Sequence, residues 1–256
     1  MNDADILASL PAFAFVLALV LARTGMVVML LPGLGEAEPP PIVRAGLALA
    51  LSLLLLPGVA ALVPDTPGPA TGAAMIGAEL LAGAVLGWLA RLPALALAMA
   101  GAVVSYMLGL SSVLQQDAAL GGQSAALARL FGLVAPVLIL STGLYALPLS
   151  ALAGSYHIIP PGGVLPAGML ADTVTQAAGA SFGLAVRLAA PFLVAGTIWQ
   201  AALGLLARLV PQLQVYTAAA PGQIVGGLVL LGLLASRILG AWSGSLEADW
   251  SGLPGL

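Results

Sequence analysis

The chain has 256 residues, 61% of them hydrophobic and only 7% charged, and its mean hydropathy is +1.12. A soluble domain needs more ionic surface than this, so the composition excludes one. The formal net charge is −3, and the 7 basic residues are all arginines spread singly along the chain. Without a basic run or patch, nucleic acid is excluded as a partner.

The chain contains no cysteine and 1 histidine, which excludes disulfides, thiolate metal sites and sites built mainly from histidines. We expect no cofactor, no metal and no catalytic residue. Apolar runs of about 20 residues are long enough to cross a bilayer as helices. They predict an all-α integral membrane protein of about six or seven apolar helices, arranged as hairpins with Pro- and Gly-broken segments. Residues 1–242 are expected to form one domain.

The first apolar run covers residues 1–31 and is interpreted as a retained span. Asp3 and Asp5 stand where a secretory signal would carry positive charge, and the run is too long for a signal. Arg23 lies inside this run. Because a charge in lipid is costly, we expect Arg23 to face other helices, with snorkelling toward an interface as the alternative.

Prolines and glycines then divide the chain. A loop is predicted over residues 33–41 and a second helix over 45–63, whose end is marked by Pro57, Pro64, Asp65, Pro67 and Pro69. A third helix is predicted over 73–92, with its end marked by Arg91 and Pro93. Gly83 and Gly87 have the spacing that lets two helices approach closely. Glu79 is interpreted as an interface or capping residue, with an ion or proton ligand as the alternative.

Residues 101–124 form a polar, glycine-bearing break between two long apolar segments. Such a break is either a loop outside the bilayer or the lining of a pore, because polar groups at membrane depth need protein or water as neighbours. The following run, 125–152, contains Pro136 and Pro148 and is predicted to be kinked or a hairpin of short helices.

Residues 155–172 are predicted to form a loop that contains Ser155 and His157. A hydrolase interpretation of this pair is disfavoured, because a serine nucleophile also needs an orienting group and an oxyanion site.

Two further helices are predicted over residues 179–209 and 223–242, with a bend over 207–221 between them. In that bend Arg208 is expected to bond the carbonyls freed by Pro211. Gly222 and Gly226 repeat the close-packing spacing. Residues 243–256 are expected to be a short, flexible, acidic tail.

Several motifs, in order, resemble the FliR family of flagellar export-gate proteins, called SctT in virulence-type type III secretion. The most specific is residues 203–221, LGLLARLVPQLQVYTAAAP, which is similar to the family's leucine-rich helix, Arg, Pro-Gln-Leu, near-aromatic bend and Pro. The matching positions are Arg208, Pro211, Gln212, Leu213, Tyr216 and Pro221.

Other parts of the chain carry the resemblance further, from Arg23 to about Leu239. Gly109-Leu110-Ser111, Asp117 and Gly122-Gln123-Ser124 resemble the family's GLS…D…GTQS pattern. Its two loops are matched by Pro32, Gly33, Arg44 and Gly46 and by Leu152, Ser155, Tyr156, Pro160 and Gly162. This sequence has Ser112 and Gln115 where relatives place aromatic residues, and Gln214 where Asn is usual.

The resemblance implies an export-gate subunit of the bacterial inner membrane at the flagellar basal body. It implies FliP-like and FliQ-like partners, an FlhB-like protein at the entrance, and unfolded flagellar proteins as substrates. A bulky, glycine-flanked plug would close the pore. Its candidate residues are Tyr106, Met107, Gly109, Leu110, Ser111, Val113, Leu114, Gln115, Asp117, Gly121 and Gly122; assembly residues would be Arg23, Arg44, Arg208, Pro211, Gln212 and Pro221.

No enzymatic role is expected, because the resemblance implies passage of unfolded chains and not chemistry. Energy would come from other components, since the chain has no lysine to complete a phosphate-binding P-loop. A small-solute or ion secondary transporter is the alternative, with Glu79, Arg91 or Asp117 as coupling groups. We further expect partner helices and membrane lipid to surround the chain. Partner helices would supply acceptors for the arginines in or beside apolar runs, Arg23, Arg129, Arg187 and Arg208.

Overall fold

A computed structural model describes the chain except residues 1–2, 37–38, 64–66, 111–125, 164–166 and 211–213. The described residues form helices and no strand, in the order α1 (Asp3–Leu30), α2 (Pro41–Ala60), α3 (Pro69–Met107), α5 (Ala126–Thr142), α6 (Ala146–Ile158), α7 (Ala167–Leu209) and α8 (Val215–Ser251). Among them, 5 helices are long and apolar enough to cross a membrane, or 6 if the bent pair α5 and α6 counts as one span. The predicted all-α membrane architecture is confirmed.

One predicted helix end is absent from the structure. The second helix ends at Ala60, close to the predicted 63 and with Pro57 inside it, but α3 continues through Arg91 and Pro93 as one helix of 39 residues. A proline removes one backbone hydrogen bond, but neighbouring helices and local adjustment can satisfy the freed groups of a membrane helix. The prediction of two helices separated at Pro93 was therefore wrong.

The kink or hairpin predicted within residues 125–152 is a bend between α5 and α6. The two helices differ in direction by 73°, and the bend falls at Gly143, whose φ of +78° is left-handed, and at neither Pro136 nor Pro148. α6 then extends to Ile158, so Ser155 and His157 are helical. Their predicted position in a loop was wrong.

The C-terminal helix is longer than expected. α8 continues to Ser251, whereas residues from 243 onward were expected to form a flexible tail. Ile238, Trp242, Leu246 and Trp250 recur every four residues and are all buried, as one face of a helix requires. The Trp242 indole N–H donates to the Pro93 carbonyl at 3.2 Å, and that of Trp250 to the Ala90 carbonyl at 3.0 Å.

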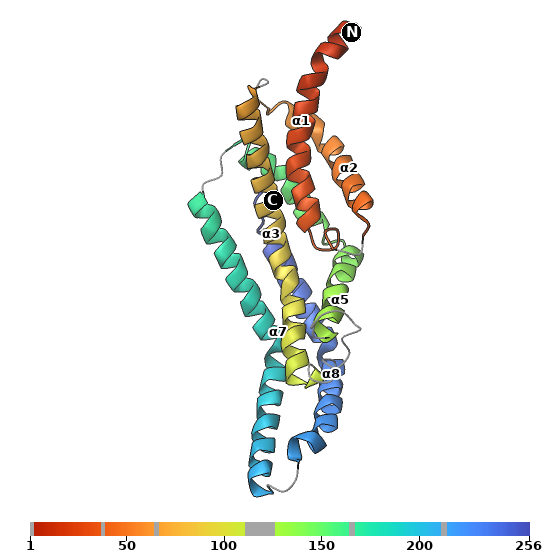
Figure 1. The fold of residues 1–256 in the computed structure, drawn as a ribbon, viewed down its shortest axis with the longest axis vertical. Coiled ribbons are helices and arrows are strands. Elements are labelled where there is room, and N and C mark those ends of the chain that lie inside the picture. The colour runs from red at the N-terminus through yellow and green to blue at the C-terminus, as the bar shows by residue number, and fades with distance from the viewer. Residues whose placement is uncertain (1–2, 37–38, 64–66, 111–125, 164–166, 211–213) are drawn as a thin grey trace. The chain divides into compact units, whose positions relative to one another are not determined.

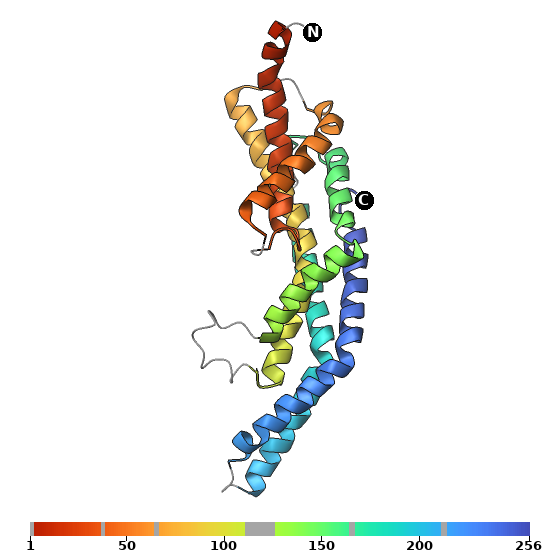
Figure 2. The ribbon, with the colours of Figure 1, turned by 90° about the vertical axis from the view of Figure 1, so that its right-hand side faces the viewer.

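The chain divides into two compact units. Unit 1 comprises Met1–Leu92, Pro136–Ala177 and Ala248–Leu256; unit 2 comprises Pro93–Ala135 and Ala178–Glu247. In unit 1, α1 and α2 are neighbours (Figure 1). In unit 2, α7 and α8 run side by side (Figure 2).

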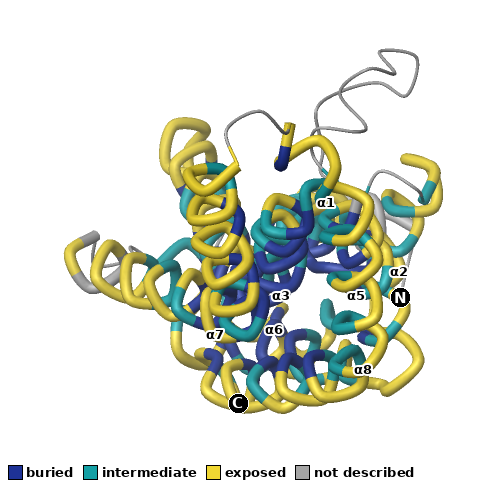
Figure 3. Tube along the Cα trace, turned by 90° about the horizontal axis from the view of Figure 1, so that it is seen from below, coloured by how far each residue is buried: buried dark blue, intermediate teal, exposed yellow. Residues whose placement is uncertain are grey.

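Burial is concentrated in α3. In its most apolar window 61% of the residues are buried, against 6% in that of α8, which is largely exposed (Figure 3). α3 is therefore the core helix of the fold, and α8 presents most of its span outward.

The close approach predicted at Gly83 and Gly87 is confirmed. A Cβ added at Gly83 would overlap the Arg23 carbonyl oxygen, and one at Gly87 would lie 2.8 Å from the Leu30 Cβ. Helices α1 and α3 thus touch through backbone, because two small residues one turn apart leave room for it.

We expect Gly83→Ala and Gly77→Ala, both in α3, to change stability in opposite directions. The Gly77 Cβ would meet nothing within 4 Å, so alanine there gains helix propensity, about 0.5–1 kcal/mol. At Gly83 the added methyl forces α1 away and costs about 1–3 kcal/mol. Thermal unfolding of the membrane-extracted protein measures both; equal stabilisation by the two variants would contradict the close contact.

Candidate functional site

A buried ion pair lies in unit 1. Arg23 of α1 and Glu79 of α3 are 1% and 0% exposed. The Arg23 Nε donates to Glu79 Oε2 at 2.8 Å and its Nη2 donates to Oε1 at 2.9 Å. This two-point geometry is the strong form of an arginine–carboxylate pair, since both donors and both oxygens are engaged.

The remaining groups of this pair are also satisfied. Arg23 Nη1 donates to the Ser155 Oγ at 3.1 Å, Nη2 donates to the Ile159 carbonyl at 3.0 Å, and the Gly162 N–H donates to Glu79 Oε1 at 2.8 Å. The Tyr156 ring covers the guanidinium, with 4.1 Å from Cζ to the ring centroid. We call Arg23, Glu79, Ser155, Tyr156 and Gly162 the Arg23 cluster.

The Arg23 cluster is built to hold helices together. It joins α1, α3 and α6 with the turn that follows α6, and both of its charges are neutralised by protein. Glu79 was expected at an interface; it is buried, and its oxygens are occupied by Arg23 and Gly162. The Ser155 hydroxyl donates to the Leu152 carbonyl at 2.7 Å, while His157 is exposed. This leaves the serine poorly placed for nucleophilic chemistry.

The expectation that partner helices supply the acceptors of Arg23 was wrong, because its own chain supplies them. Arg91 is likewise satisfied within unit 1, donating to the Leu30 carbonyl at 3.1 Å and to Glu36 Oε2 at 3.3 Å. Arg129, Arg187 and Arg208 are exposed, on α5 and α7.

The end of α3 in unit 2 is the described part of the predicted plug. Leu108 N–H donates to the Val104 carbonyl at 2.9 Å, and Gly109 N–H donates to that of Tyr106 at 3.1 Å. Gly109 has a φ of +74°, a left-handed conformation that terminates helices and favours glycine. Tyr106 is 69% exposed.

The start of α5 lies against this end of α3. The Leu127 N–H donates to the Ser105 Oγ at 3.2 Å, and a Cβ added at Gly101 would lie 2.7 Å from the Leu127 carbonyl oxygen. The chain therefore leaves α3 and enters α5 at neighbouring positions, on either side of residues 111–125.

Helices α7 and α8 both contact the end of α3. The Gln223 Nε2 of α8 donates to the Met107 carbonyl at 2.7 Å. The Met107 side chain packs against Gly196 of α7, where an added Cβ would lie 3.0 Å from its sulfur. Leu108 packs against Gly227 of α8 so closely that an added Cβ would overlap the leucine.

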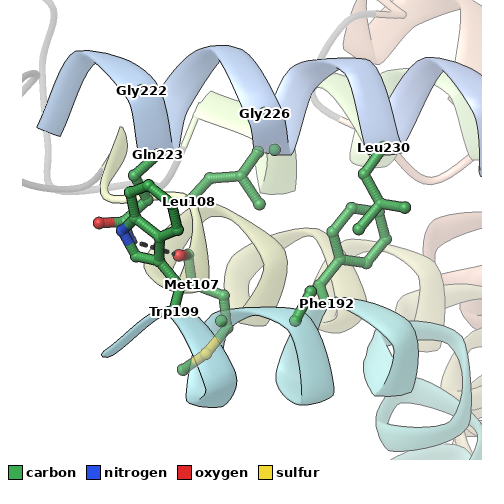
Figure 4. A pocket seen from close by; sticks show the side chains of 11 residues that line it. Met107, Leu108, Phe192, Trp199, Gly222, Gln223, Gly226 and Leu230 are labelled. Carbon is green, nitrogen blue, oxygen red and sulfur yellow. Dashed lines mark hydrogen bonds between the residues drawn. The ribbon is translucent and has the colours of Figure 1, made fainter. Parts of the chain in front are cut away.

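A cavity of about 130 Å³ adjoins these contacts. Trp199 and Gln223 lie at one end of it and Phe192 and Leu230 at the other, with Met107 and Leu108 between (Figure 4). We call Gly196, Gln223, Gly227 and this cavity the α3 socket.

The structure separates the predicted site residues. Tyr106, Met107, Gly109 and Leu110 lie together at the end of α3. Outside the described residues are Ser111, Val113, Leu114, Gln115, Asp117, Gly121, Gly122, Pro211 and Gln212. Arg44 is half-buried on α2, Arg208 is exposed in the last turn of α7, and Pro221 is exposed inside α8.

Sequence reasoning missed Gly196, Gln223 and Gly227. Gly226, predicted to give close packing, has nothing within 4 Å of its Cβ position, and its neighbour Gly227 makes the contact. A pair of adjacent glycines does not reveal which one faces the neighbouring helix, so spacing alone could not decide.

The fold and these contacts define a polytopic helical membrane protein that is held by an internal ion pair. Residues 14–248 match the family described as "Bacterial export proteins, family 1". The chain belongs to this family. Its predicted resemblance to the FliR family is confirmed.

Curated relatives agree with the family. "Flagellar biosynthetic protein FliR" of Caulobacter vibrioides is 34% identical over 235 residues, which cover 90% of this chain and 92% of the relative. The protein of the same name from Escherichia coli is 27% identical over 208 residues, 81% of this chain and 79% of the relative. That of Bacillus subtilis is 27% identical over 156 residues, 60% of each chain.

We expect either Arg23→Met or Glu79→Gln alone to destabilise the protein by about 3–5 kcal/mol, because each leaves one buried charge unpaired. The double variant removes both charges and should recover most of that loss. The Arg91–Glu36 pair, with side chains 21% and 27% exposed, is the matched control. Glu36→Gln should cost about 1 kcal/mol or less.

Thermal unfolding of the parent and the four variants measures these differences. Additive losses in the double variant would show that Arg23 and Glu79 act independently.

Proposed function

We propose that the chain is an export-gate subunit of the flagellar type III secretion apparatus. In this role it forms, with FliP-like and FliQ-like partners, the pore through which unfolded flagellar proteins cross the bacterial inner membrane. The observation that carries the proposal is the similarity over 235 residues to a protein named for flagellar biosynthesis, within a family of bacterial export proteins.

A pore for unfolded chains must open widely in transport and exclude ions at rest. Bulky side chains can meet both needs if they fill the lumen without covalent attachment and the backbone beside them can move. The end of α3 supports this role, because Tyr106 is largely exposed there and Gly109 has a conformation that favours glycine. We assign residues 106–122 to the resting seal, with Met107 suited to adaptable packing.

Partners follow from the exposed surface. α7 and α8 expose large apolar side chains such as Ile198, Leu205 and Leu233, and Arg187 lies among them on α7. Helices of FliP-like and FliQ-like subunits would cover part of this surface and accept hydrogen bonds from the arginines, with lipid covering the rest. An FlhB-like protein would stand at the entrance. The subunit provides a path and no chemistry, so other components supply the energy.

Deleting residues 111–122 should open a path for ions while leaving assembly intact, because the surrounding helices keep their contacts. Alanine at Met107 and Leu110 together should raise conductance to a smaller extent. The measurement is ion leak in cells or in liposomes that carry the assembled complex. An assembled deletion variant as ion-tight as the parent would place the seal elsewhere.

The partners are tested by gentle detergent extraction and mass analysis of what co-purifies. FliP-like and FliQ-like proteins at a fixed ratio are expected. A monomer or homodimer that transports a small solute would contradict the proposal.

A further inference from the structure

We propose that Gln223 is a positioning residue, which fixes the end of α3 through the backbone and so sets where the resting seal begins. The positioning role follows from the described contacts, and its consequence for the seal rests on the proposed function. No role was expected for Gln223 from the sequence.

The Gln223 side chain bonds to the backbone of α3. Gln223 Nε2 donates to the Met107 carbonyl at 2.7 Å, in the last turn of α3, where carbonyls have no partner within the helix. The same amide lies 3.6 Å from the position of a Cβ at Gly109. One side chain of α8 therefore covers both the end of α3 and the left-handed glycine that follows it.

The two glycines of the α3 socket contribute to the position of α3 through the fit of its side chains. Gly196 admits the Met107 side chain and Gly227 admits that of Leu108, because neither carries a Cβ. Among the described residues that line the cavity none is titratable, and the Gln223 amide and the Trp199 indole are its polar side chains. Gln223 is thus the directional contact in an otherwise apolar socket.

Empty space beside the contact gives this single bond its importance. The cavity of about 130 Å³ is several times the roughly 10–15 Å³ that one water needs by the same measure, so Met107 has room to move once its carbonyl is released. Packing on Gly227 holds Leu108, whereas the Met107 carbonyl is fixed by the hydrogen bond from Gln223.

Cysteine crosslinking tests the position without reference to transport. The chain has no native cysteine, and a Cβ at Gly196 would lie 3.3 Å from the Met107 Cβ, close to disulfide range. A chain carrying Met107→Cys and Gly196→Cys keeps the Met107 carbonyl, so it should crosslink quickly in the assembled complex. Adding Gln223→Leu should lower the initial crosslinking rate about fivefold, the factor that one neutral hydrogen bond supplies.

Two neighbouring glycines of α8 provide the matched control. Gly227→Ala places a methyl on Leu108 and should lower crosslinking as Gln223→Leu does, whereas Gly226→Ala has free space and should leave it unchanged. Equal crosslinking in the Gln223→Leu and parental backgrounds would overturn the proposal. So would an equal loss with Gly226→Ala.

Gln223→Glu separates the hydrogen bond from packing, because the two side chains have nearly the same shape. A carboxylate cannot donate to a carbonyl, but a protonated carboxyl group can. Relative to the Gln223 background at the same pH, crosslinking in Gln223→Glu should recover as pH falls. A loss that does not vary with pH would mean that packing, and not the donated bond, positions α3.

Ion leak in the same variants connects position to function. If Gln223→Leu lowers crosslinking and raises leak, both the positioning role and the seal are supported. If crosslinking falls while the membrane stays ion-tight, Gln223 still positions α3 but the seal assigned to residues 106–122 is wrong.

Discussion

The buried ion pair between Arg23 and Glu79 is the constraint on which unit 1 depends. An arginine in a membrane helix costs at least about 2.5 kcal/mol near the bilayer midplane, and burying it unpaired would cost more. Here every side of the charge is met by Glu79, Ser155, the Ile159 carbonyl or the Tyr156 ring. These partners lie on separate helices, so the charge is tolerated only while α1, α3 and α6 are together.

Gly83 allows α1 and α3 to come close enough for the Arg23–Glu79 ion pair to form. It lies one helical turn after Glu79, against the carbonyl of Arg23. A larger residue there would hold α1 away from α3, and a 2.8 Å bond between Arg23 and Glu79 needs the two helices close. The ion pair and the glycine contact therefore depend on each other, because Arg23 contacts α3 through both its side chain and its backbone.

The sequence was sufficient for the membrane class, the number of apolar helices and the close contact at Gly83, since each follows from composition or local spacing. It was insufficient for Arg23, whose partner lies 56 residues away and is one of several acids. It misled at Pro93, because proline signals a helix end only where neighbours do not satisfy the freed carbonyls. The row Trp242, Leu246 and Trp250 was a readable signal of a buried helix, outweighed by the acidic residues beside it.

Charge is distributed differently in unit 2. No described carboxylate pairs with Arg129, Arg187, Arg208 or Arg237, all of which are exposed, whereas Arg23 and Arg91 of unit 1 have acidic partners. An exposed arginine among apolar side chains needs an acceptor from outside the chain, either a lipid headgroup or a carboxylate on another helix. α8 buries only 6% of its most apolar window, so its long apolar surface also needs lipid or another helix to cover it. Unit 1 thus pairs Arg23 and Arg91 with its own acids, although the buried Nε of Arg44 has no hydrogen-bond partner among the described residues. Unit 2 leaves its arginines and its apolar surface to be completed by its surroundings, as a subunit of a membrane assembly would.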